Sequence, residues 1–161
     1  MNSLISRSTV LVAVAIGSLL AATPARAQSD EGAIVAAVTK FLDGIRTRDT
    51  SLMRATVVAG ATLVTVGGPT GLGAPSTIDA VIERTGKGTG PGNDERIEKP
   101  MVQIDDQLAS LWAYFTLARA GETKIDRCGT NLFLLRKGPD GWKVFQIAAT
   151  SRTEGCRAVS K

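Results

Sequence analysis

Histidine is absent from the 161 residues of this sequence, and its absence excludes several classes of site. Serine and cysteine hydrolases of the triad type need an imidazole to take the proton of the nucleophile, and many zinc sites use histidine as a ligand. The sequence also lacks the G-x-S-x-G motif that carries the nucleophile of many α/β-hydrolases. We therefore predict none of these catalytic sites, no metal site and no cofactor.

Long apolar runs are also missing, apart from one near the start of the sequence. There the segment VLVAVAIGSLL follows Arg7 and precedes Ala25-Arg26-Ala27. A basic residue, a short apolar run and an A-x-A site are typical of a secretory signal peptide, and the run is shorter than the about 20 residues that span a membrane. We predict a leader over residues 1–27, an exported (periplasmic or secreted) protein with no membrane span, and one domain over residues 28–161.

A strong excess of positive charge is absent once the leader is set aside. The leader holds two of the 19 lysines and arginines and none of the 15 acidic residues, which leaves a net charge of +2. No cluster of basic residues falls on one predicted face, so we expect no nucleic-acid partner. A glycine-rich stretch, GKGTGPG, lacks the spacing of a phosphate-binding loop and predicts a mobile loop.

The apolar spacing and the turn residues predict helices first and strands afterwards. The predicted helices cover residues 30–46, 50–57 and 76–84, and the predicted strands cover residues 61–66, 95–104, 108–120, 124–135 and 142–151. Pro100 indicates that its strand lies at an edge or carries a bulge. This order predicts an α+β fold, with N-terminal helices packed on a strongly curved, mostly antiparallel sheet.

Two hairpins set the predicted register of the last three strands. The turn in KGPDGW suits a type I turn and places Leu135 opposite Val144. A two-residue loop at Gly121 places Tyr114 opposite Gly129. Because directly opposed residues share a sheet face, this register predicts one face that is nearly all apolar and one that is mixed.

The mixed face holds the candidate ligand-binding residues, because apolar walls with a few convergent polar groups suit a small-molecule pocket. Trp112 and Phe133 are predicted as walls, Tyr114, Asn131, Gln146 and Thr150 as hydrogen-bonding groups, and Arg127 as a contact for an anionic group. The alternative is that the aromatic residues belong to an ordinary core and that the polar residues form a wet rim.

The only two cysteines lie near the two ends of the last hairpin, at Cys128 and Cys156. In an exported protein an oxidised pair is favoured over two free thiols. We predict a disulfide that attaches the C-terminal tail to the sheet, with a contribution of about 3 to 4 kcal/mol by the chain-entropy model.

The chain resembles the nuclear transport factor 2-like superfamily, which includes SnoaL-like and ketosteroid-isomerase-like proteins. The likeness is carried by the first amphipathic helix, by LWAYFTL at residues 111–117, and by CGTNLFLLRKGPDGWKVFQIAATSR at residues 128–152. The resemblance implies a cone-shaped, cystatin-like α+β roll with a cavity at its wide end. Similar exported members carry a histidine before the Cys-Gly pair and an acid three residues after the cysteine. Arg127 and Asn131 stand there in this chain, and neither is a general base at neutral pH.

These observations leave three functional hypotheses open. The leading one is an exported, non-catalytic domain that binds a small, partly apolar ligand in the cone cavity. The second is an isomerase or dehydratase-like enzyme that uses Tyr114, which would need a carboxylate nearby. The third is a protein-interaction module whose cavity is filled by its own side chains.

The apolar face also predicts a homodimer through the outer side of the sheet. Its members are Leu111, Ala113, Phe115, Leu117, Leu132, Leu134, Phe145 and Ile147. Few soluble monomers expose so large an apolar surface, and a symmetric pair is the commonest oligomer. The alternative is that the two faces are inverted and that the apolar one meets the helices.

Overall fold

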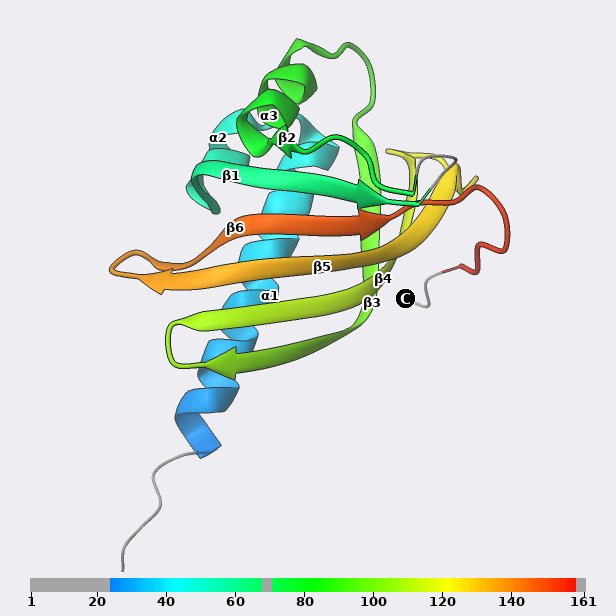
Figure 1. Cartoon of the computed structure of the whole chain (residues 1–161). Helices are drawn as coiled ribbons and strands as arrows, with labels where there is room; N and C mark the ends of the chain where they lie inside the picture. Colours follow the sequence, from blue (N-terminus) through cyan, green and yellow to red (C-terminus); the bar gives the residue numbers. More distant parts are fainter. Residues whose placement is uncertain (1–23, 68–70, 159–161) are drawn as a thin grey trace, which may run out of the picture.

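The computed structural model describes residues 24–67 and 71–158, and side chains from Ser29 onward. Three helices accompany one six-stranded sheet (Figure 1). The helices are α1 (Pro24–Thr47), α2 (Thr50–Ala55) and α3 (Ile78–Lys87), and the strands are β1 (Val57–Val66), β2 (Ser76–Thr77), β3 (Asn93–Asp105), β4 (Leu108–Arg119), β5 (Arg127–Gly138) and β6 (Gly141–Thr150). The predicted leader lies almost entirely outside the described residues.

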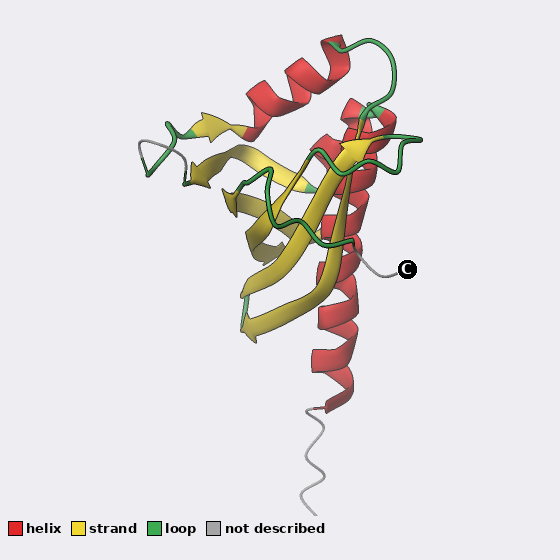
Figure 2. Ribbon diagram, turned by 90° about the vertical axis from the view of Figure 1, so that its right-hand side faces the viewer, coloured by secondary structure: helices red, strands yellow, loops and turns green. Residues whose placement is uncertain are grey.

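The sheet has the strand order β2-β1-β6-β5-β4-β3 and does not close into a barrel. The β1–β6 pair is parallel, and the four other pairs are antiparallel. Helix α1 runs along one side of this curved sheet, as Figures 1 and 2 show from two directions. The predicted α+β class, with N-terminal helices on a mostly antiparallel sheet, is confirmed.

The core lies between α1 and the concave face of the sheet. Ile34, Val38 and Phe41 recur at the spacing of one helical face and are buried, as the periodicity predicts. They meet the inward side chains of the strands, among which Leu111 and Phe133 are almost fully buried. Burial of this apolar stripe is what fixes α1 against the sheet.

Three of the described strand pairs carry an irregularity, and in the β1–β6 pair it lies between Val57 and Thr62. In β3 the register shifts between Glu98 and Met101, at Lys99 and Pro100, and Lys99 has a positive φ of 45°. Both predictions for Pro100 are confirmed, because β3 is an edge strand and carries an irregularity at this point. Another shift lies in the β5–β6 pair, at Phe145. Such shifts strengthen the local bend and twist of a sheet.

The predicted register is wrong by one residue over the β4–β5 hairpin. Tyr114 pairs with Thr130 and Phe115 pairs with Gly129, because the connection is longer than a two-residue loop. The β5–β6 hairpin agrees with the prediction at Leu135 opposite Val144. Beyond the irregularity at Phe145 that pairing is also offset by one residue.

These offsets change which residues share a face, because neighbouring strand residues point to opposite sides. The apolar face as predicted does not exist. Leu111, Ala113, Phe115 and Ile147 face the helices and are buried. Leu132 and Leu134 pair with Trp112 and Ser110 on the other face. On β4 the apolar side chains therefore face the helices, as the alternative with inverted faces predicts.

The glycine-rich segment between α3 and β3 is held by one arginine. The Arg48 guanidinium donates hydrogen bonds to the carbonyl oxygens of Thr85, Thr89, Gly90 and Pro91, at 2.8 to 3.3 Å. These bonds attach the segment, which the sequence predicts as a loop, to the end of α1. No helix of the described residues is long and apolar enough to cross a membrane.

Candidate functional site

A cavity of about 320 Å³ opens between the concave face of the sheet and the helices α1 and α3. Its volume is at the lower end of the range of small-molecule sites, roughly 300 to 1,000 Å³. Its inner walls are apolar and buried, and they include Phe41, Ile78, Phe115 and Phe133. The wide end of the cone is thus not filled by the protein's own side chains.

Two polar side chains from different strands meet in this cavity. Asn131 on β5 donates a hydrogen bond from Nδ2 to Oε1 of Glu95 on β3, at 2.6 Å. Both residues face inward, because Asn131 pairs with the buried Ala113 and Glu95 pairs with Leu117. Asn131 is only 3% exposed, so its amide needs a partner in the protein, and Glu95 provides it.

The position of Glu95 changes its acid–base behaviour. Burial raises the pKa of its carboxyl from 4.5 to about 7, although the hydrogen bond from Asn131 acts in the opposite direction. Removal from water disfavours the charged form of a carboxyl group, and this effect is the larger one here. Glu95 is therefore a carboxyl group that changes charge near neutral pH inside an apolar cavity.

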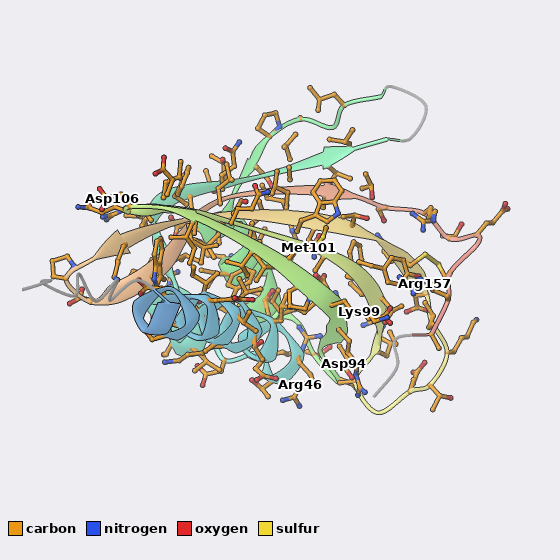
Figure 3. The ribbon with its side chains drawn as sticks, turned by 90° about the horizontal axis from the view of Figure 1, so that it is seen from below. Arg46, Asp94, Lys99, Met101, Asp106 and Arg157 are labelled. Carbon is orange, nitrogen blue, oxygen red and sulfur yellow. A yellow bond between two sulfur atoms is a disulfide. The ribbon has the colours of Figure 1, made fainter. Side chains whose placement is uncertain are left out.

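Glu95 also borders a second hollow, between α1 and the start of β3. This groove has a volume of about 340 Å³ and shares only Leu42 and Glu95 with the cavity, among the described residues. Its walls include Arg46 at the end of α1 and Asp94 on β3, which lie near each other in Figure 3. Glu95 thus lies between the apolar cavity and a charged surface groove.

The mouth of the cavity is marked by its exposed lining residues. Arg84 of α3 and Arg127 of β5 are exposed, as are Asn93, Thr150 and Ser151. The mouth is therefore polar, whereas the interior is apolar.

The structure divides the seven predicted ligand-binding residues between two places. Arg127, Asn131, Phe133 and Thr150 line the cavity. Trp112, Tyr114 and Gln146 lie on the opposite, outer side of the sheet, since they pair with Leu132, Thr130 and Leu134. The offset of one residue in the hairpins accounts for this division.

Tyr114 contacts the C-terminal tail rather than the cavity. Its hydroxyl donates to the carbonyl oxygen of Arg157 at 3.1 Å and accepts from the amide of the same residue at 3.0 Å. The Arg157 guanidinium lies 4.4 Å from the centre of the Tyr114 ring and pairs with Glu98 at 3.0 Å. Tyr114 therefore attaches the tail to the sheet, and the geometry gives it no part in the cavity.

The predicted disulfide between Cys128 and Cys156 is confirmed. Cys128 is buried on β5, and its amide and carbonyl both bond to the backbone of Arg152, at 2.9 Å each. The cysteines, Tyr114 and the Glu98–Arg157 pair together attach the tail to the outer side of the sheet. The described residues contain no group of three or more potential metal ligands.

Glu95 is the residue that the sequence analysis missed. The sequence analysis required a carboxylate near Tyr114 for an enzymatic function and named no residue for it. Glu95 lies on the first of the late strands, 36 residues before its partner Asn131. The only sequence signal was the alternation of DERIEK after the glycine-rich segment, which places Glu95 and Ile97 on one face.

Comparison with protein-family models gives no match for this chain, and no curated protein matches it. Its fold does match solved structures. One is a nuclear transport factor 2-like protein with a cystatin-like fold from Novosphingobium aromaticivorans, at 17% identity and a TM-score of 0.66, over 83% of this chain and 88% of that one. Another is a nuclear transport factor 2-like protein of unknown function from Shewanella baltica, at 20% identity and a TM-score of 0.59, over 78% of this chain and 95% of that one.

A third is a nuclear transport factor 2-like superfamily protein from Salmonella enterica, at 14% identity and a TM-score of 0.59, over 84% of this chain and 99% of that one. At these identities the likeness establishes the fold alone. The chain has the nuclear transport factor 2-like, or cystatin-like, fold, as the resemblance in the sequence implies.

Proposed function

We propose that this protein is an exported domain that binds a small, partly apolar molecule in the cavity between the sheet and α3. The observation that carries the proposal is a cavity of about 320 Å³ with buried aromatic walls and one polar pair, Glu95 and Asn131. Such a combination binds a ligand by apolar burial and orients it by a few hydrogen bonds. An unfilled cavity argues against an interaction module whose own side chains occupy it.

Export is supported by the disulfide, since such bonds persist in oxidising compartments and are rare in the cytosol of most organisms. The leader predicted over residues 1–27 points the same way.

The binding proposal is tested by filling the cavity from its wall. Ala149 lines the cavity, and Ala148, its neighbour on β6, points to the outer side. Ala149→Leu should weaken binding of a neutral bicyclic ketone, 2-tetralone, at least about tenfold, because it occupies ligand volume. Ala148→Leu should bind it as the wild type does. The measurement is ligand-observed NMR, and equal binding by both variants would contradict the proposal.

A second candidate function is proton transfer by Glu95. A carboxyl group with a pKa raised to about 7 that lines a ligand-sized cavity is suited to act as a general base. The NMR titration with 2-tetralone, repeated in D₂O, measures this proton transfer. A base next to the ketone would exchange the α-hydrogens of 2-tetralone for deuterium. Glu95→Gln should bind 2-tetralone and leave this exchange at the background rate. Tyr114 has no role in this proposed proton transfer.

We also propose a homodimer through the outer face, with a different set of residues from the one first predicted. Met101, Trp112, Leu132 and Ala148 form a row across four strands on this face. Met101 is 61% exposed and Trp112 is 48% exposed, which is unusual for a large apolar pair in a monomer. A two-fold partner would bury this row.

The dimer is tested by placing a charge in the row. Trp112→Glu should give a folded monomer in sedimentation, because an unpaired carboxylate cannot be buried without a large cost. Ala36→Glu, at an exposed position of α1, should sediment as the wild type does. A wild type that is monomeric at high micromolar concentration would refute the dimer.

A further inference from the structure

The arginines of the described chain differ in whether they have partners. Arg46, Arg54 and Arg96 form ion pairs with Asp43, Asp79 and Asp94. The guanidinium of Arg48 donates to four backbone carbonyls, and the guanidinium of Arg157 pairs with Glu98. Four other arginines, Arg84, Arg119, Arg127 and Arg136, make no side-chain hydrogen bond, ion pair or ring contact to another described residue. Of these four, Arg84 and Arg127 are the two that line the cavity. Both line the mouth of the same cavity, from two different elements.

The charge balance of the cavity lining is positive. Among the described lining residues the charged ones are the two arginines and a single acid, Glu95. Glu95 lies farther inside, beside Asn131. Two positive side chains at the rim of an apolar cavity make the potential at the opening positive, and the low dielectric of the walls concentrates their field there. This potential favours a ligand with a negative charge at the mouth.

We propose that the ligand of this cavity is an organic monoanion, a carboxylate on an apolar body, with the carboxylate held at the mouth by Arg84 and Arg127. The inference rests on the proposed binding function and specifies the class of ligand. A guanidinium presents its donors in a fork that matches the two oxygens of a carboxylate. The apolar body then lies inward against Phe41 and Phe133.

The orientation of such a ligand follows from the position of the charges. Its carboxylate stays at the exposed rim, where desolvation costs little. Glu95 lies inside, so a carboxylate that entered first would meet a second acid in an apolar site. The cavity therefore selects compounds with one charged end and one apolar end, and disfavours compounds that are charged at both ends.

The test compares 4-phenylbutyrate with its neutral isostere 4-phenylbutyramide on the full protein by isothermal titration calorimetry. The acid should bind the wild type at least about tenfold more tightly than the amide, because hydrogen bonds to charged groups are stronger than neutral ones. In the double variant Arg84→Gln/Arg127→Gln the ratio of acid affinity to amide affinity should fall to about one, because glutamine keeps a hydrogen-bond donor but carries no charge. Arg136→Gln, which removes an exposed arginine that does not line the cavity, should keep it.

The outcomes separate this inference from the function on which it rests. If the amide binds as tightly as the acid, and Ala149→Leu weakens both, the cavity binds ligands but the anion preference is wrong. If the double variant keeps the preference for the acid, the two arginines are not its cause and the inference is overturned. If neither compound binds while 2-tetralone does, the inference is overturned and the proposed function stands; if 2-tetralone also fails to bind, both are wrong.

Discussion

The variant Glu95→Gln should be more stable than the wild type at pH 8, by about 2 to 3 kcal/mol, and equally stable near pH 4. The reason is that burial raises the pKa of Glu95 from 4.5 to about 7 in the folded protein. Glutamine has the shape of the neutral carboxyl and keeps an oxygen that accepts the hydrogen bond from Asn131. It cannot become charged inside the cavity.

The sign of the effect follows from the direction of the shift. The folded protein keeps its proton on Glu95 up to about pH 7, whereas the unfolded chain releases it from about pH 4.5. The contribution of Glu95 to stability is therefore fully present below pH 4.5 and is lost as the pH rises towards 7. Full conversion of the shift gives about 3 kcal/mol, and water that enters the cavity reduces it.

Urea unfolding at a series of pH values from 4 to 8 measures this difference. Glu83→Gln is the matched control, because Glu83 is exposed on α3 and its carboxyl is already in water. The control should follow the wild type at every pH. A Glu95→Gln variant that is less stable than the wild type at pH 8 would show that the charged carboxylate is the favoured form.

The elements of this fold follow from local patterns in the sequence. The buried stripe of α1 has helical spacing, and the turn at Asp140-Gly141 closes the last hairpin where its residues predict. Thr77 caps α3 by accepting a hydrogen bond from the amide of Ala80 at 3.2 Å, and the helix begins at Ile78, close to the predicted start at residue 76. Each of these features depends on residues within a few positions of one another.

The register does not follow from local patterns, and the site depends on the register. The connection from β4 to β5 runs from Arg119 to Arg127, and the Asp126 amide bonds to the carbonyl of Leu117 at 2.9 Å. Nothing in the residues around Gly121 distinguishes this longer loop from a two-residue turn. The resulting offset moved Trp112 and Tyr114 to the wrong face.

Asn131, Phe133 and Arg127 were placed together correctly because they alternate along a single strand, which no register error can change. Their acidic partner could not be found in the same way. Glu95 reaches Asn131 across β4, through two strand pairings that must both be known. A contact of this kind is a property of the assembled sheet rather than of any segment.

The variant Cys156→Ser should unfold at a clearly lower urea concentration than the wild type, with a loss of stability of about 3 to 4 kcal/mol. The disulfide spans a sequence separation of 28 residues, so its removal returns considerable freedom to the unfolded chain. Cys156 is half-buried in the tail, and its replacement by serine costs little in itself. Cys128 is a poorer choice, because a hydroxyl at its fully buried position adds a second cost.

Chemical reduction of the disulfide distinguishes the effect of losing the bond from the effect of replacing the Cys156 side chain. A reducing agent should shift the unfolding midpoint of the wild type to that of Cys156→Ser and should leave the variant unchanged.

Tyr114→Phe, which removes the hydroxyl that holds the backbone of Arg157, should cost only about 1 kcal/mol, because the disulfide still attaches the tail. Binding of 2-tetralone should survive in both variants, since the tail lies on the side of the sheet opposite the cavity. If reduction leaves the wild type unchanged, the tail is held by Tyr114 and by the Glu98–Arg157 pair, and the disulfide adds little.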